Sequence, residues 1–205
     1  MKIITISREF GSGGRELGKR IADILGFDYY DKEIISAIAK NKGLNENYVA
    51  FALEHHGWHN FPITFRHSFI NASFPPVQVD LLLEQKRVIE EISNLGNDFV
   101  IIGRNSDILL KEYNPLNLFV CAEMQSKIER CVARADENEH LTVKQMEKKI
   151  RSIDKNRART REMISDIPWG RRDAYHLTLN TSNWDIKELS PLVALFAESW
   201  FKKVQ

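Results

Sequence analysis

Residues 2–26 read KIITISREFGSGGRELGKRIADILG, and this stretch decides the fold. The β-branched run Lys2–Ser7 predicts a buried strand. A glycine-rich loop follows, and apolar residues at helical spacing then continue as far as Gly26, which predicts a helix that ends there. In such a unit the loop can turn backbone N–H groups inward, beside the positive end of the helix. The sequence therefore predicts a phosphate-binding loop at the carboxyl end of the first strand.

The glycines allow more than one register for this loop. Residues 13–19 nearly complete the pattern G-x-x-x-x-G-K-[ST], but Arg20 stands where the hydroxyl residue belongs. That register would also delay the start of the helix. We therefore expect the glycines of residues 11–14 to form the turn and the helix to begin near Arg15.

In this register the loop departs from the common nucleotide-binding pattern. Gly14 takes the place of the phosphate-binding Lys, and no Ser or Thr follows it to hold magnesium. Arg8 and Arg15 are the cations that flank the loop. A dinucleotide-binding G-x-G-x-x-G pattern fails at Glu16, and a plain flexible turn is the alternative interpretation.

Further apolar strands alternate with helices along the rest of the chain. Strands are expected at Phe27–Tyr30, Phe99–Ile102, Leu116–Cys121 and Tyr175–Leu179. Helices are expected from Asp31 onward and at Asn45–Glu54, Val77–Leu95, Ser126–Arg134, Thr142–Met163 and Asp185–Val204. This alternation predicts a parallel α/β sheet with helices on both faces. We expect one domain over residues 1–205, in which residues 45–76 and 142–173 are insertions on the core.

Composition narrows the class of protein. The 205 residues include 29 Lys and Arg and 28 Asp and Glu, so the net charge of +1 argues against nucleic-acid binding through bulk charge. No stretch approaches the ~20 apolar residues of a membrane span. Cys121 and Cys131 form neither a disulfide framework nor a zinc cluster. We therefore expect a cytoplasmic protein that acts on small molecules.

Three stretches carry a resemblance to a known family. They are ITISREFGSGGRELGKRIADILGFDYYDKEII, VIIGRNSDILL, and DKNRARTREM with the later WGRRDAYHLTLNTS. They resemble the cytidylate kinase-like family, a branch of the P-loop nucleoside-monophosphate kinases. The resemblance implies a three-layer α/β/α fold with a five-stranded parallel sheet of order 2-3-1-4-5, a helical acceptor-binding insertion and an arginine-rich lid. It implies transfer of the γ-phosphoryl group of ATP, with Mg²⁺, to a nucleoside monophosphate or a related small acceptor.

The resemblance also implies roles for particular residues. The phosphate loop that would hold ATP consists of Gly11, Ser12, Gly13, Gly14 and Arg15. Asp31 and Arg104 match positions near the acceptor, and Arg8 is a further cation that we expect to bind substrate. Arg157 and Arg161, which share one helical face, fall in the lid. Together with the loop's own arginine they would stabilise the transferred phosphoryl group. No residue is assigned to a metal.

Each of these assignments has a structural alternative. Arg104 follows a buried strand, where its fork-shaped guanidinium suits a phosphate, but a salt bridge to Asp107 is the alternative. Asp31 is equally explained as the N-cap of the next helix. Residues 144–173 hold ten Lys or Arg and five Asp or Glu. This charge fits a lid that closes over phosphates or a solvated helix laced with ion pairs.

Two departures leave a second function open. Cytidylate kinases have Lys and then a small or hydroxyl residue in the loop, where this chain has Gly14 and Arg15, and they have Asp where this chain has Ile102. The alternative to a kinase is therefore a nucleotide-binding sensor or interaction module that has lost catalysis. A nucleic-acid binder that uses the basic lid is a third interpretation, which the neutral total charge disfavours.

Residues 55–76 are rich in His and aromatic side chains. His55, His56, His59 and His67 lack a carboxylate or Cys at matching spacing, so we do not expect a metal site. The aromatic side chains are interpreted as cover or as a subunit contact, which leaves a homodimer open, and base stacking is the alternative.

Overall fold

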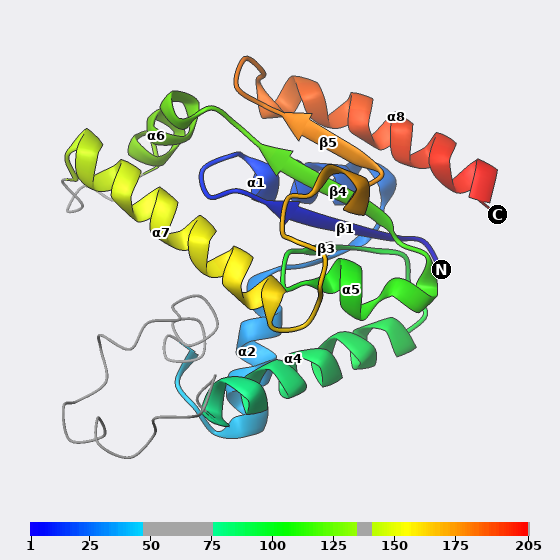
Figure 1. The fold of residues 1–205 in the computed structure, drawn as a ribbon. Helices are drawn as coiled ribbons and strands as arrows, with labels where there is room; N and C mark the ends of the chain where they lie inside the picture. The colour runs from blue at the N-terminus through cyan, green and yellow to red at the C-terminus, as the bar shows by residue number, and fades with distance from the viewer. Residues whose placement is uncertain (47–75, 135–140, 205) are drawn as a thin grey trace, which may run out of the picture.

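The computed structural model describes residues 1–46, 76–134 and 141–204 (Figure 1). Its elements are β1 (Ile3–Arg8), α1 (Gly14–Leu25), β2 (Asp28–Tyr30), α2 (Lys32–Lys42), α4 (Pro76–Asn94), β3 (Phe99–Ile102), α5 (Ser106–Leu109), η3 (Lys111–Tyr113), β4 (Leu116–Cys121), α6 (Met124–Val132), α7 (Val143–Glu162), η4 (Arg172–Ala174), β5 (Leu177–Asn180) and α8 (Ile186–Val204). The expected insertion at 45–76, with its helix Asn45–Glu54 and its His-rich segment, lies almost entirely outside the described residues.

The strands form one five-stranded sheet of order β2-β3-β1-β4-β5. All four pairings are parallel, and β1 is the middle strand, with Ile4 opposite Val100 on β3 and Leu116 on β4. The strand order and the parallel direction confirm the expected α/β fold. Because ligands of open parallel sheets bind at the carboxyl ends of the strands, this topology puts the end of β1 at the centre of the binding edge.

Helices cover both faces of the sheet, because successive side chains of a strand point to opposite sides. Ile4 and Ile6 of β1 pack in one buried cluster with residues of α1 and α8. Ile3 of β1 packs in a second cluster with residues of α2 and α4. Figure 1 shows the resulting layers, with α8 along one side of the sheet and α4 along the other.

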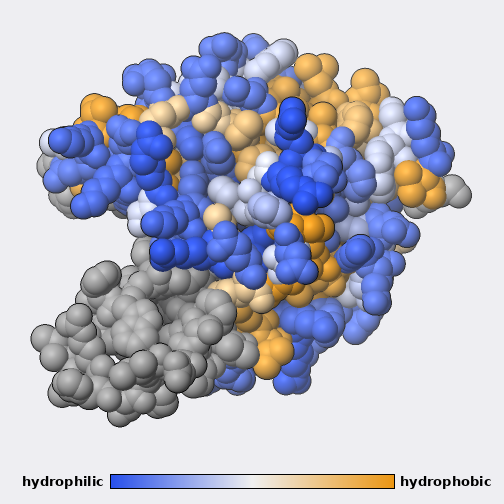
Figure 2. Space-filling model, viewed as in Figure 1, coloured by the Kyte–Doolittle hydropathy of each residue, from blue (hydrophilic) through white to orange (hydrophobic). Residues whose placement is uncertain are grey.

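The helix α7, which lies in the segment expected to form a lid, is separate from these two layers. Thr142 and Gln145 form a reciprocal capping box at its start. Met146 and Ile150 pack against Ile128 of α6, so a small separate core fixes the α6–α7 pair. Figure 1 shows α7 crossing in front of the edge where the strands end, and Figure 2 shows that this face of the molecule is mainly hydrophilic.

Several element bounds differ from those expected. α1 begins at Gly14 rather than at Arg15. β5 begins at Leu177 rather than at Tyr175, because the Tyr175 ring instead packs on Phe119, with ring centroids 5.0 Å apart. None of the helices in the described ranges is long and apolar enough to cross a membrane.

Candidate phosphate-binding site

The loop after β1 has the backbone form of an anion cradle. Gly11 and Gly13 are left-handed, with φ of 77° and 81°, and Ser12 between them is not. This alternation turns successive N–H groups toward one point. α1 begins directly after the loop, at Gly14, so its positive end adds to the attraction for an anion. The glycines therefore form the turn that was expected of them. The N–H of Ser12 donates to the carbonyl of Glu9 at 3.4 Å, and phosphate binding by the loop stays a prediction.

Buried contacts keep the loop in this shape. Ser12 is fully buried, and its hydroxyl donates to the carbonyl of Glu9 at 2.8 Å. Thr181, which follows β5, donates from its hydroxyl to the carbonyl of Ser12 at 2.7 Å and accepts from Arg130 at 3.1 Å. The turn between β5 and α8 is thus hydrogen-bonded to the backbone of the loop.

Four arginines gather beside the loop, and two of them face the buried carboxylate of Asp31. Asp31 is buried, and its Oδ2 lies 2.5 Å from Nε of Arg15, while its Oδ1 lies 3.7 Å from Nη2 of Arg8. Arg157 donates from Nη1 to the backbone carbonyl of Arg8 at 2.9 Å. Arg104 acts electrostatically on Arg8 as well. Asp31 faces Arg8 and Arg15, and Arg157 pairs with Asp154 at 3.4 Å. The positive charge gathered beside the loop would attract an anion.

Burial and the neighbouring arginines both act on the pKa of Arg8. It is lowered to about 9, first by burial, then by the charge of Arg157, and further by Arg104 and Arg15, while Asp31 opposes the shift. A guanidinium whose charged form is disfavoured in this way is stabilised when an anion binds next to it.

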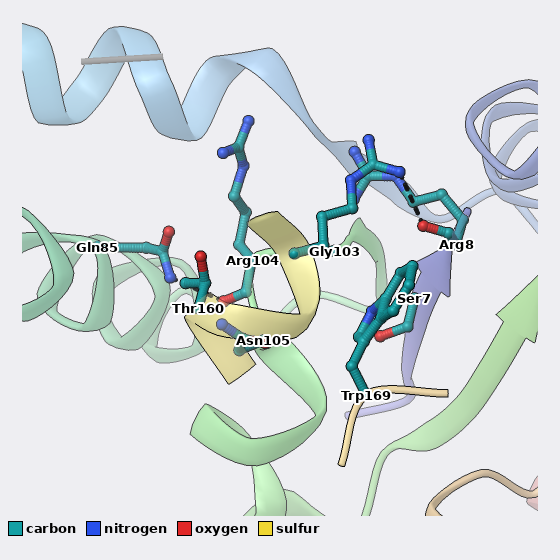
Figure 3. Close-up of a pocket in the computed structure, with 9 residues that line it drawn as sticks. Ser7, Arg8, Gln85, Gly103, Arg104, Asn105, Thr160 and Trp169 are labelled. Atoms are coloured by element: carbon teal, nitrogen blue, oxygen red, sulfur yellow. Dashed lines mark hydrogen bonds between the residues drawn. The ribbon is translucent and has the colours of Figure 1, made fainter. Parts of the chain in front are cut away.

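A cavity of about 50 Å³ opens beside these arginines (Figure 3). The residues that line it come from the ends of β1 and β3, from α4, from α7 and from the segment after α7: Ser7, Arg8, Gln85, Gly103, Arg104, Asn105, Arg157, Thr160 and Trp169. By the measure in which a water molecule needs roughly 10–15 Å³, this space holds a few waters or one phosphate-sized group.

The turn that carries Arg104 is strained. Gly103, Arg104 and Asn105 all have left-handed φ, of 64°, 59° and 53°. For a residue with a side chain this conformation costs about 1–2 kcal/mol. Gln85, which is buried on α4, donates from its side-chain amide to the carbonyl of Arg104 at 2.8 Å, and Figure 3 shows it pointing at this turn. Strain of this kind, held in place by a neighbour, is typical of binding sites.

Two of the predicted residues have contacts that the sequence did not indicate. Asp31 stands at the N-cap position of α2, but its side chain makes no capping hydrogen bond and pairs with Arg15 instead. The proposed salt bridge of Arg104 to Asp107 is also absent from the ion pairs of the described residues, since Asp107 pairs with Arg161 at 2.6 Å.

Arg161 lies away from the cavity. Its side chain is 1% exposed, and it donates from Nε to the carbonyl of Ile167 at 3.1 Å in addition to its bond to Asp107. Arg157, one turn earlier on α7, is the lid arginine that lines the cavity. Arg157 therefore lines the cavity and Arg161 forms a buried ion pair, although the two arginines share a helical face.

Arg15 faces a second and more open hollow of about 580 Å³. Its side chain is about half exposed, and the hollow is lined by residues of α1, β2 and α2, among them Tyr29, Asp31 and Lys32. Burial, followed by the charge of Asp31, raises the pKa of Tyr29 to about 12, so its hydroxyl stays protonated. Asp31 lines this hollow and also lies next to Arg8, which lines the cavity.

Sequence reasoning missed Gln85, Thr160 and Trp169. Trp169 lies beyond the end of α7 at Glu162, and its indole packs edge-on against Phe119, with ring centroids 5.3 Å apart, while lining the cavity. A buried Gln inside an amphipathic helix is the one signal that could have drawn attention to Gln85. Among the described residues, no His, Cys, Asp and Glu side chains gather in a group that could hold a metal ion, and the His-rich residues 55–67 lie outside them.

A glycine-rich loop after the central strand and an arginine-lined cavity beside it are the features expected of a P-loop kinase-like fold. The comparison with protein families agrees: residues 3–183 match the cytidylate kinase-like family, and the chain belongs to that family. A cytidylate kinase from Haloarcula marismortui is 23% identical over 184 residues, which cover 89% of this chain and 82% of that protein.

Solved structures share the fold. An uncharacterized protein from Eubacterium ventriosum superimposes with a TM-score of 0.71 at 21% identity, over 97% of this chain and 99% of the other. A shikimate kinase from Acinetobacter baumannii, solved in complex with shikimate, superimposes with a TM-score of 0.56 at 16% identity, over 97% of this chain and 94% of the other. At these identities the likeness concerns the fold alone.

Proposed function

We propose that this protein transfers the γ-phosphoryl group of ATP to a small anionic acceptor, with a nucleoside monophosphate as the leading candidate. The observation that carries the proposal is the gathering of Arg8, Arg15, Arg104 and Arg157 beside the loop and the cavity, where Arg8 and Arg15 face Asp31 and Arg157 pairs with Asp154. Phosphoryl transfer depends mainly on positioning and on neutralising charge on the phosphoryl oxygens, and guanidinium groups supply both. Membership of a kinase family supports the same reaction class.

The two halves of the site suit the two substrates. The loop amides of residues 11–15 and the side chain of Arg15 would hold the phosphates of ATP. Arg104 and Arg157 would hold the acceptor's anionic group in the cavity, which has the volume of one phosphate rather than of a whole nucleotide. Arg8 would lie between the two. The remainder of the acceptor would then lie outside this cavity.

The residues present fit ATP and offer one carboxylate for Mg²⁺. The Ser12 hydroxyl is already bonded to the Glu9 carbonyl, so it does not serve as the metal-binding hydroxyl of the loop. Asp31 is the carboxylate beside the loop, and its buried Oδ1 accepts no hydrogen bond from the described residues. That oxygen would hold the ion through one of its waters. When bound, Mg²⁺ supplies further neutralisation of the phosphate charge.

A steady-state assay tests the proposal. ATP and Mg²⁺ would be offered with CMP, dCMP, other nucleoside monophosphates, and shikimate as the acceptor of a fold relative. We expect turnover with at least one monophosphate and none with the free nucleosides. Absence of turnover with every acceptor, together with no heat of ATP binding in calorimetry, would reject a kinase.

A binding module that has lost catalysis is the second candidate. Two features favour it: Gly14 in place of the loop lysine, and the fully buried, apolar Ile102 where cytidylate kinases carry an Asp. This candidate predicts nucleotide binding without turnover of any acceptor in the same assay.

A further inference from the structure

The side chain of Arg8 occupies the space above Gly14. A Cβ built on Gly14 would lie 2.7 Å from Cβ of Arg8 and 3.2 Å from its Cγ, closer than carbon atoms approach without displacement. Gly14 is also the position at which the common phosphate loop carries its lysine. The nearest of these atoms is Cβ of residue 8, so position 14 has no room for a lysine while position 8 carries a side chain. In this chain the side chain at position 8 is the cation.

The head of the same side chain lies on Gly103. A Cβ built on Gly103 would fall 1.6 Å from Nη1 of Arg8, and the left-handed φ of 64° also favours glycine there. Gly103 belongs to the turn after β3 that carries Arg104 and lines the cavity. The Arg8 side chain therefore extends from the first turn of α1 to the cavity. Gly14 leaves room for its base, and Gly103 leaves room for its guanidinium.

A purely structural role does not account for this position. Arg8 is 8% exposed, and its nearest carboxylate oxygen, Oδ1 of Asp31, is 3.7 Å from Nη2, beyond hydrogen-bond distance. Asp31 already has a close partner in Arg15, at 2.5 Å. A buried guanidinium surrounded by Arg15, Arg104 and Arg157 gains more from an incoming anion than from the contacts it has.

We propose that Arg8 takes over the part of the missing loop lysine and binds the phosphoryl group that is transferred. This cation comes from the end of β1 instead of from the first turn of α1, and Gly14 and Gly103 are the residues that make room for it. The inference rests on the proposed function and assigns a catalytic residue to it. Its step is electrostatic: no bond to Arg8 forms or breaks, and the guanidinium keeps its protons.

A double-mutant cycle tests whether a lysine at position 14 can replace Arg8. The proteins are the native chain, Arg8→Ala, Arg8→Gly, Gly14→Lys and the double variant Arg8→Gly/Gly14→Lys. Glycine is used in the double variant because the atom nearest to the new side chain is Cβ of residue 8, which alanine would keep. Arg8→Ala and Arg8→Gly should each weaken ATP binding in calorimetry by roughly 10- to 100-fold, the scale of a lost charge-assisted hydrogen bond. Gly14→Lys alone should lower the melting temperature, because the new side chain meets Arg8. The double variant should melt above Gly14→Lys and bind ATP at least about tenfold more tightly than Arg8→Gly.

Arg8→Gln separates binding from folding, since it keeps the unbranched Cβ–Cγ–Cδ stem and a polar end group and removes the charge. We expect it to melt at or above the native temperature, because it removes charge repulsion, and still to lose ATP affinity. A lower melting temperature with native ATP affinity would show a structural role and overturn the proposal. Native affinity in Arg8→Ala, or a double variant no better than the worse single variant, would overturn it as well.

Tripolyphosphate distinguishes failure of this inference from failure of the proposed function. If no acceptor is turned over and ATP does not bind, but tripolyphosphate binds in a way that depends on Arg8, the kinase is rejected and the anion site of Arg8 stands. If tripolyphosphate binds equally well to the native chain and to Arg8→Ala, or to neither, the assignment of Arg8 is wrong.

Discussion

The carboxylate of Asp154, on α7, accepts a hydrogen bond from the backbone N–H of Phe10 at 2.7 Å. Lys127 of α6 lies 3.2 Å from the other oxygen of Asp154 and 2.8 Å from Glu9. Arg157 adds a contact over the Phe10 ring, 5.8 Å from its centroid. α7 is thus attached to Glu9 and Phe10, the residues just before the phosphate loop. We therefore expect a substitution at this contact on α7 to change the stability of the loop.

Removal of the Asp154 carboxylate should loosen this attachment. Asp154→Ala leaves the Phe10 amide and one side of the Lys127 ammonium without their partner, so we expect a loss of about 1–3 kcal/mol in the free energy of unfolding. Hydrogen exchange at Phe10 should become faster. Glu147→Ala is the matched control, because its exposed ion pair with Arg151 on the same helix should contribute at most about 1 kcal/mol. Equal effects of the two substitutions in urea unfolding would contradict the attachment.

The Arg161–Asp107 ion pair should behave as a buried structural pair. Both side chains are nearly inaccessible, so Arg161→Met leaves the Asp107 carboxylate buried without its cation and should cost about 3–5 kcal/mol in urea unfolding. Arg161→Met/Asp107→Leu should recover most of that loss, because no charge is left unpaired. If the double variant is stable but no longer binds nucleotide or acceptor, Arg161 acts in catalysis after all.

Arg104 should contribute to acceptor binding and little to ATP binding. Arg104→Ala should weaken the affinity for a nucleoside monophosphate by about 1.5–3 kcal/mol, the value of a charge-assisted hydrogen bond, in isothermal calorimetry. Arg87→Ala is the control, since that arginine is exposed on α4 and pairs with Glu91. Unchanged monophosphate affinity in Arg104→Ala would remove Arg104 from the site.

His176 should make the fold sensitive to acid. Partial burial lowers the pKa of His176, and its Nδ1 accepts a hydrogen bond from the backbone N–H of Asn117 at 2.9 Å, which requires the neutral ring. The unfolded chain therefore takes up this proton at a higher pH than the folded chain does. The stability from the neutral ring is complete above about pH 6.5 and is lost as the pH falls from there through the lowered pKa.

The same argument gives the measurement for His176. Urea unfolding of the native chain and of His176→Gln, at pH 7.5 and at more acidic values, should show the smaller loss of stability in the variant. Parallel pH profiles for the two proteins would mean that His176 does not titrate differently on folding.

Much of the fold could be predicted because local patterns carry it. Buried parallel strands are continuous apolar runs, and Phe99–Ile102 and Leu116–Cys121 were expected with the bounds that the structure has. The strand order followed from the family resemblance and not from periodicity. The predicted start of β5 was wrong. Tyr175 is a residue type typical of strands, but in the structure it precedes β5 and its ring packs on Phe119.

The sequence could predict a site residue only where its position follows from the strand directly before it. The loop glycines and Arg104 follow strands directly, so their place at the carboxyl edge could be inferred. The partner of Arg161 could not, because Asp107 lies on the four-residue helix α5, which is too short to leave a periodic signal. The contact between Gly14 and Arg8 depends on how α1 lies against β1, which no spacing in the sequence reports.

A crystal structure with a non-hydrolysable ATP analogue and a nucleoside monophosphate tests the central claim most directly. We predict β- and γ-phosphates on the amides of residues 11–15, the terminal phosphate within hydrogen-bond distance of the Arg8 guanidinium, and the acceptor phosphate against Arg104 and Arg157. Nucleotide bound elsewhere, or loop amides that point away from any phosphate, would contradict the account.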